Sequence, residues 1–320
     1  MKDFLSFIQS QKKKSKKILE KHKDFILPIS LLLATSLLFI TDTWVHNRLK
    51  DYTLTKVPFE VSSAAKYPVI SRDFLPEVSA QAAVVMDNDS KVVLYEKNPE
   101  IRFSPASTTK IMTALVGLDY YNLGDTLTVM MPFTEGSVLG LTQGERITFE
   151  NLLYAMLLPS ANDSAHVIAQ NYPGGEEAFI AKMNKKAQSL SLNNTHFGDP
   201  AGLQDDANFT TAKDLARLAS VAIKNKTFAK IVDTKTKVIT SVDRSFVYNI
   251  NNLNKLLGLY GVSGIKTGYT EEAGEVLVTS TIIKGHSVII VVMRSENRFA
   301  DTEKLLQLIS ENVNYLSIHP

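Results

Sequence analysis

A serine and a lysine stand three residues apart at the start of an apolar, helix-like segment: Ser107 and Lys110 in "SPASTTKIMTAL" (104–115). On a helix, positions i and i+3 share a face, so the hydroxyl and the amine would be neighbours. Burial lowers the pKa of a lysine, because desolvation disfavours the charged form. A neutral amine beside a hydroxyl is one way to make a serine nucleophilic. The pair is therefore a candidate nucleophile and general base.

The Ser-x-x-Lys spacing alone is a weak signal, because it occurs four times in the chain. Two further patterns single out the copy at Ser107. "PSAND" (159–163) places Ser160 and Asn162 in a break between two helix-like segments, where a polar loop can project into a cleft. "GIKTGYT" (264–270) holds the only Lys-Thr-Gly of the chain, and its Gly268 would let a substrate backbone approach closely. The order of the three patterns resembles the motif set of penicillin-binding proteins and β-lactamases.

The elements that must position these residues are β-rich at both ends of the folded part and helical in its middle. Residues 80–98 read as a β-hairpin, and 274–283 and 286–293 read as strands separated by Lys284-Gly285. Helical patterns follow Ser107 and cover 147–158, 163–170, 176–190, 210–223 and 300–313. We predict an α+β fold in which both chain ends build one antiparallel sheet, flanked by helices and joined to a helical subdomain.

From about residue 78 to 310 the chain resembles the serine D-alanyl-D-alanine carboxypeptidases, the low-molecular-mass penicillin-binding proteins. The resemblance rests on the three motifs and on further stretches in the same order: "MLLPSANDSAHVIA", "LNNTHFGDPAGL", "TTAKDLARLA", "VSGIKTGYTEEAG" and "NRFADTEKLL". It implies the β-lactamase/DD-peptidase-like fold and cleavage of the bond between the two terminal D-alanines of a peptidoglycan stem peptide. It also implies inhibition by β-lactams, and a reaction without metal or organic cofactor.

The resemblance assigns the catalytic roles. Ser107 would attack the substrate carbonyl and become acylated, and Lys110, kept neutral by burial and by the positive field of Lys266, would take its proton. Ser160 would relay a proton to the departing D-alanine amine. The backbone N–H groups of Ser107 and Tyr269 would form the oxyanion hole.

The resemblance also assigns substrate binding. Asn162 would hold the substrate amide and Lys110 in register, while Lys266 and Thr267 would bind the terminal carboxylate. Arg298 matches an arginine that the family uses for this carboxylate, and its planar fork suits the task. The alternative for Arg298 is pairing with an acid such as Asp301.

Three other residues invite attention. His196 could act as a general base but is expected to hold a loop, and His166 on an apolar helix face is expected to pack in the core. Glu275 departs from the family pattern, which carries an aromatic or small residue there.

The N-terminal region predicts a membrane anchor. Residues 1–23 hold eight lysines and two acidic residues, and they precede the apolar segment "FILPISLLLATSLLFI" (25–40). We predict a cytoplasmic tail (1–24), a single transmembrane anchor (25–41), a spacer (42–72) and an extracytoplasmic catalytic domain (73–320). A cleaved signal peptide is the alternative for the apolar segment. Nucleic-acid binding by the lysines is the less favoured alternative, and no nucleic-acid partner is expected.

Composition excludes some chemistry and leaves some functions open. The chain has no cysteine, which excludes disulfides, thiolate catalysis, cysteine metal sites and lipoprotein acylation. A β-lactamase is the nearest rival, but the chain lacks a Glu-x-x-Leu-Asn sequence. A catalytically silent penicillin-binding or wall-binding domain is the rival of a different class. The sequence does not separate carboxypeptidase from endopeptidase or transpeptidase activity.

Overall fold

The computed structural model describes residues 12–13, 20, 66–70, 75–204 and 206–317. The chain divides into two compact units, Met1–Ser62 and Ser63–Pro320, and the fold described below belongs to the second. The predicted membrane anchor at 25–41 lies outside the described residues. Within the part of the chain that the structure describes, no helix combines the length and apolarity needed to cross a membrane.

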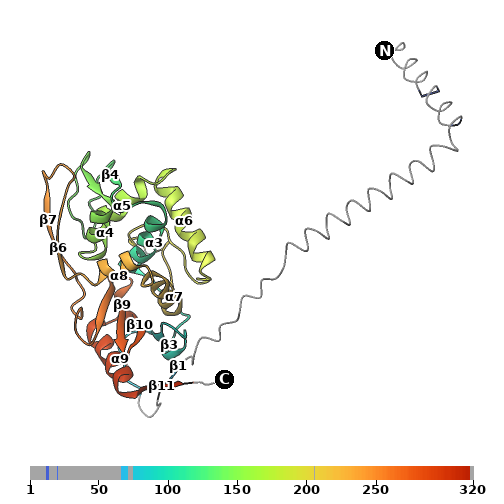
Figure 1. Cartoon of the computed structure of the whole chain (residues 1–320), viewed down its shortest axis with the longest axis vertical. Coiled ribbons are helices and arrows are strands. Elements are labelled where there is room, and N and C mark those ends of the chain that lie inside the picture. Colours follow the sequence, from blue (N-terminus) through green and yellow to red (C-terminus); the bar gives the residue numbers. More distant parts are fainter. Residues whose placement is uncertain (1–11, 14–19, 21–65, 71–74, 205, 318–320) are drawn as a thin grey trace. The chain divides into compact units, whose positions relative to one another are not determined.

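One five-stranded sheet forms the centre of the unit, in the order β3-β2-β10-β9-β8, with every neighbouring pair antiparallel. The strands are β2 (Ala82–Asp87), β3 (Val93–Lys97), β8 (Val262–Thr270), β9 (Gly274–Ile283) and β10 (His286–Ser295). Strands from both ends of the chain lie side by side, which confirms the predicted sheet (Figure 1). β9 and β10 each have a run of six consecutive buried residues because both faces of the sheet are covered.

The two faces of the sheet bury separate cores. Helix α9 (Arg298–Asn312) packs on β9 and β10 and buries Leu305 and Ile309 against Leu277 and Ile290. On the other face, α7 (Ala212–Ala222) packs on β2 and β10, and the larger core continues into the helical region. Sheet and helices therefore form the layered α+β arrangement that the sequence predicts.

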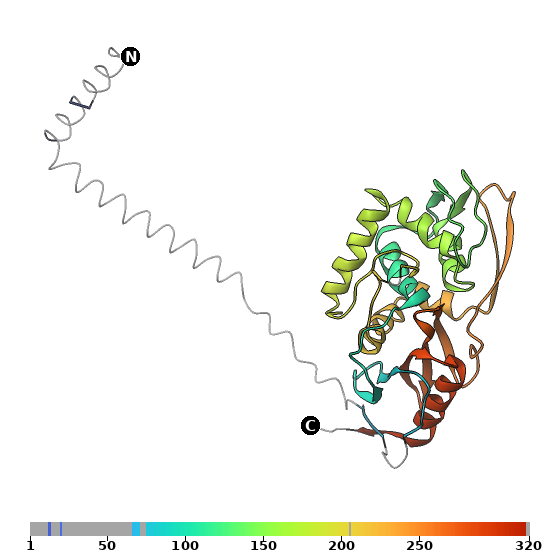
Figure 2. The ribbon, with the colours of Figure 1, turned by 180° about the vertical axis from the view of Figure 1, so that it is seen from behind.

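The helical region contains η1 (Ala106–Thr109), α3 (Lys110–Tyr120), α4 (Phe149–Leu157), α5 (Asn162–Gln170), α6 (Gly175–Ser189) and α8 (Lys226–Val232). Both views show α4, α5 and α6 gathered at one end of the unit, with the sheet and α9 toward the other (Figures 1 and 2). The predicted helices are confirmed within a few residues, and the Thr211 side chain caps α7 by accepting from Asp214 N–H. One difference matters for the site, since Ser107 lies in a 3₁₀ turn and α3 begins only at Lys110.

The sequence patterns missed three small antiparallel ribbons and α8. The ribbons are β4–β5 (Thr126–Thr128, Arg146–Thr148), β6–β7 (Thr236–Thr240, Val247–Asn251) and β1–β11 (Lys66–Ile70, Val313–Ser317). Their strands are three to five residues long and partly exposed, so they carry little hydrophobic period. β1 falls inside the predicted spacer, so at 66–70 that segment is a paired strand. The predicted domain boundaries themselves stay predictions.

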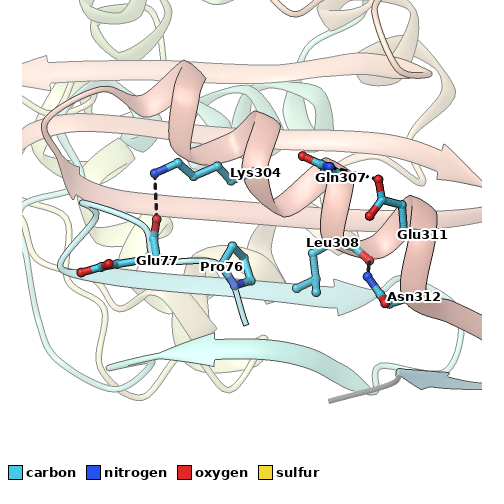
Figure 3. Close-up of a pocket in the computed structure, with 7 residues that line it drawn as sticks. All are labelled: Pro76, Glu77, Lys304, Gln307, Leu308, Glu311 and Asn312. Atoms are coloured by element: carbon cyan, nitrogen blue, oxygen red, sulfur yellow. Dashed lines mark hydrogen bonds between the residues drawn. The ribbon is translucent and has the colours of Figure 1, made fainter. Parts of the chain in front are cut away.

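A pocket of about 350 Å³ lies between α9 and the segment that leads into β2 (Figure 3). Lys304 Nζ crosses it and donates to the Glu77 carbonyl at 2.8 Å, and Gln307 Nε2 donates to Glu311 Oε1 at 3.0 Å. None of its lining residues belongs to the site predicted from the sequence.

Candidate active site

The first two motifs meet at the amine of Lys110. Its Nζ lies 2.9 Å from Ser107 Oγ, 2.7 Å from Asn162 Oδ1 and 2.8 Å from the Ala201 carbonyl oxygen. The Lys110 side chain is fully buried, whereas Ser107 stays partly exposed. The 3₁₀ turn and the first turn of α3 therefore place the hydroxyl where substrate can reach it and the amine behind it.

Burial lowers the pKa of Lys110 to about 7, against the opposing pull of the Asp199 and Asp163 carboxylates. A general base works best when its pKa lies near the operating pH, because it is then both available and strong enough. At neutral pH a substantial fraction of Lys110 is a neutral amine, able to accept the Ser107 proton.

The second motif lies in the break between α4 and α5, as predicted. Ser160 adopts a left-handed backbone conformation (φ 68°) and is 5% exposed. Its buried Oγ has no hydrogen-bond partner among the residues that the structure describes. Such strain and unpaired polar groups are found at functional sites because only a surrounding scaffold maintains them. The hydroxyl is thus available for a group that the substrate brings.

Asn162 is held by a loop that the sequence patterns did not single out. Its side-chain Nδ2 donates to the Glu135 carbonyl at 2.9 Å, and its backbone N–H donates to the Ser137 carbonyl at 2.7 Å. These bonds turn Oδ1 toward Lys110. Residues 135–137 therefore form part of the wall of the site.

The third motif lies on β8, the edge strand of the sheet. Lys266 is 2% exposed, and its Nζ donates to the Thr267 carbonyl at 2.9 Å. Burial lowers the pKa of Lys266 well below its ordinary value, and repulsion by Lys110 and Arg298 lowers it further. Lys110 thus acts on the pKa of Lys266, whereas the expected contribution of Lys266 to keeping Lys110 neutral stays a prediction.

Gly268 brings β8 against the nucleophile turn. A Cβ there would lie 3.2 Å from Ala106 Cβ, from the Pro105 carbonyl oxygen and from Ser107 N, closer than side chains normally pack. Any larger residue would push the strand away from Ser107. This close approach is what the predicted oxyanion hole requires. The assignment of that hole to the N–H groups of Ser107 and Tyr269 stays a prediction.

Arg298 reaches the same strand from the first turn of α9. Its guanidinium donates to the Gly268 carbonyl at 2.8 Å. The alternative pairing with Asp301 is not what the structure has. The Asp301 carboxylate instead accepts from Ser79, Ala80 and Ser295, at 2.6–2.9 Å.

Sequence reasoning missed Asp199, which builds the loop behind Lys110. Its carboxylate accepts five hydrogen bonds of 2.6–3.0 Å, from the backbone N–H groups of residues 201–204 and from Asn208 Nδ2. Burial raises the pKa of Asp199, but these donors outweigh burial and the pKa is lowered. The loop presents the Ala201 carbonyl to Lys110. The stretch "HFGDPAGL" contained the signal, as an acid followed by a proline-glycine turn.

Two histidines lie in structural settings. His196 Nδ1 lies 2.8 Å from the Ala207 carbonyl oxygen, and the ring stacks on Phe209, consistent with the expected loop-holding role. His166 is buried, stacks on Phe133 and pairs through Nδ1 with Glu176 at 2.9 Å. The core packing expected of His166 thus comes with a side-chain partner, Glu176.

No cluster of three or more His, Asp or Glu side chains suited to a metal ion occurs among the described residues. The cofactor-free reaction implied by the resemblance stays a prediction.

The comparisons with known proteins agree with this geometry. Residues 69–297 match the family model described as D-alanyl-D-alanine carboxypeptidase, peptidase S11. The D-alanyl-D-alanine carboxypeptidase of Streptomyces sp. (strain K15) is 35% identical over 253 residues, which are 72% of this chain and 87% of that protein. The D-alanyl-D-alanine endopeptidase of Escherichia coli (strain K12) is 32% identical over 258 residues, 78% of this chain and 83% of that protein.

The crystal structure of the Streptomyces K15 DD-transpeptidase superposes with a TM-score of 0.68 at 33% identity, covering 73% of this chain and 98% of that one. The fold and the three motifs thus define a serine peptidase of the penicillin-binding class. The chain belongs to the D-alanyl-D-alanine carboxypeptidase family, peptidase S11.

Proposed function

We propose that this protein is a serine D-Ala-D-Ala carboxypeptidase that removes the terminal D-alanine from peptidoglycan stem peptides and is acylated by β-lactams. The observation that carries the proposal is the position of the Lys110 amine, 2.9 Å from Ser107 Oγ and 2.7 Å from Asn162 Oδ1. Burial makes this amine a base with a pKa of about 7. The same family also includes endopeptidases, so the carboxypeptidase activity is the finer part of the proposal.

Acylation follows from the positions of the side chains. Ser107 Oγ attacks the carbonyl carbon of the penultimate D-alanine as Lys110 Nζ takes the hydroxyl proton. Backbone N–H donors beside Gly268 stabilise the oxyanion. The C–N bond then breaks, and Ser160 Oγ, buried and without a partner among the described residues, relays to the leaving amine of D-alanine the proton that Lys110 took from Ser107.

Deacylation reverses the proton transfers. Water adds to the acyl carbonyl as Lys110, again a free amine, takes its proton, and Ser107 Oγ leaves with this proton returned by Lys110. The products are the shortened stem peptide and free D-alanine.

Recognition of the terminal carboxylate belongs to the sheet side of the site. Lys266 and Thr267 lie on the edge strand, and Arg298 reaches that strand through the Gly268 carbonyl. A carboxylate arriving here favours the protonated form of Lys266, because an opposite charge nearby raises the pKa of an amine.

We also propose that the enzyme acts outside the cytoplasmic membrane, anchored by residues 25–41. The lysine-rich segment that precedes the apolar stretch supports this orientation. Protease added to intact cells should degrade the catalytic unit while sparing the N-terminal tail, and protection of the whole chain would contradict the topology.

The test of the activity is intact-mass analysis of the full-length chain after treatment with benzylpenicillin, beside Ser107→Ala. We expect one stable penicillin adduct in the wild type and none in the variant. Release of D-alanine from an acetylated tripeptide ending in D-Ala-D-Ala is then measured. Hydrolysed penicillin without an adduct would indicate a β-lactamase, and an untouched drug would indicate a silent domain.

A further inference from the structure

The structure places Glu275 beside β8, the strand proposed to bind the terminal carboxylate. It is the second residue of β9, and its register partners are Tyr269 on β8 and Ser295 on β10. Register partners project from the same face of an antiparallel sheet. The next residue on that face of β9, Leu277, lies opposite Thr267. Glu275 therefore projects from the sheet face that carries the side chains of Thr267 and Tyr269.

Glu275 is also tied to Arg298. Its Oε2 accepts the backbone N–H of Arg298 at 2.8 Å, while the guanidinium of Arg298 donates to the Gly268 carbonyl at 2.8 Å. Burial lowers the pKa of Arg298, and the negative charge of Glu275 raises it. The glutamate thus acts electrostatically on the one arginine that contacts the Lys-Thr-Gly strand among the described residues.

Both residues line one pocket of about 520 Å³. Its walls also include Lys255, whose Nζ lies 5.5 Å from the ring centroid of Phe299. Arg298 is the residue of this lining that is also proposed to bind the substrate carboxylate, and it connects the pocket to that subsite.

We propose that Glu275 is a specificity-determining residue that weakens the selection for a free carboxylate on the leaving group. The inference rests on the proposed function. A D-alanine carboxylate is attracted by Lys266 and Arg298 and repelled by Glu275. An uncharged leaving group interacts only weakly with these three charges. Glu275 thereby widens the substrate class to D-alanyl bonds whose leaving amine lacks a free α-carboxylate, such as an amidated or cross-linked residue.

The alternative is a purely structural role, in which the carboxylate only holds the first turn of α9. A carboxylate near a helix N-terminus is favourable in any case. Glu275→Gln separates the two roles, because the glutamine carbonyl still accepts the Arg298 N–H while the charge is removed.

The experiment compares two acetylated tripeptides, one ending in D-Ala-D-Ala with a free carboxylate and one with the C-terminal amide. The kcat/KM ratio of carboxylate to amide is measured for the full-length wild type, for Glu275→Gln and for Glu303→Gln. Glu303 lines the same pocket and is exposed, but makes no hydrogen bond to Arg298 among the described residues. We expect the ratio to rise about 3- to 10-fold in Glu275→Gln, the size expected for one partly screened charge.

The amide reaction should stay within about twofold in Glu275→Gln, which shows that the site is intact, and Glu303→Gln should match the wild type. Higher salt should shrink the rise, because it screens exposed charges. An unchanged ratio, an equal loss with both substrates, or an equal rise in Glu303→Gln would each overturn the proposal. Failure of the wild type to cleave either peptide would instead overturn the carboxypeptidase function, and this inference with it.

Discussion

The site contains two fully buried lysines, Lys110 on its helical side and Lys266 on its sheet side. They differ in the number of hydrogen-bond partners of the side-chain amine. Lys110 has three oxygen partners, which match the three hydrogens of an ammonium group. For Lys266 the structure gives a single partner within the described residues, the Thr267 carbonyl. Burial lowers the pKa of both.

The difference indicates a division of labour. Lys110 is held in one position from three directions, as a base that must move a proton at one atom requires. Lys266 keeps donor capacity unused, as a receptor for an incoming anion requires. A buried charge without partners is costly, so the empty enzyme favours the neutral form of Lys266, and binding of a carboxylate restores its charge.

The largest effect should come from Lys110→Met, which keeps the apolar stem and removes the base. Acylation by benzylpenicillin should slow by about 10²–10⁴-fold, the usual contribution of a general base. Stopped-flow or intact-mass kinetics measure this, with Lys182→Met, at an exposed position of α6, as the matched control. Acylation at the wild-type rate would show that another group takes the Ser107 proton.

Lys266→Met should weaken binding of the substrate carboxylate rather than proton transfer. We expect kcat/KM for the D-Ala-D-Ala peptide to fall about 10²-fold, while the amide-capped peptide loses less, because only the former brings a carboxylate. The midpoint of thermal unfolding should rise, since replacing a buried amine that has few partners with an apolar chain removes a desolvation cost. Equal losses with both peptides would assign Lys266 to proton transfer instead.

The pH dependence follows from Lys110. Its free amine is the active form and its pKa is about 7, so acylation should rise with pH through this value and level off above it. Between pH 8 and pH 6 the rate should fall by about tenfold. A profile of benzylpenicillin acylation against pH measures it, with circular dichroism to verify folding. A flat profile down to pH 5 would contradict the assignment of the base.

Asp199→Asn should give the smallest loss of acylation rate. It tests how far the loop behind Lys110 supports the position of the amine. The amide can accept at one oxygen only, so the loop that presents the Ala201 carbonyl loses part of its support. We expect several-fold slower acylation and a free energy of unfolding lower by about 1–3 kcal/mol. Asp206→Asn, an exposed change in the same loop, is the control. Wild-type kinetics with reduced stability would limit Asp199 to a folding role.

Much of the fold could be predicted because the sequence patterns of its main strands and helices are long. The runs of β9 and β10 and the helix of α7 with its Thr211 cap carry enough periodicity to identify the element. The β1–β11 ribbon could not be predicted in this way, since each strand has five residues and its partner lies at the other end of the described chain. The loop at 135–137 carries no motif, because it acts through backbone carbonyls that any residue supplies.

The sequence by itself determined the chemistry: a serine, a lysine three residues later, Ser-x-Asn and Lys-Thr-Gly in that order name the reacting groups. Only the tertiary structure decided their state. The pKa of Lys110 is lowered because the core excludes water around it, and Ala201 and Asn162 hold its amine in place. Glu275 contacts Arg298 because α9 brings that residue to it from another element. Burial and long-range proximity set pKa values and charge balance, and neither can be read from local residue order.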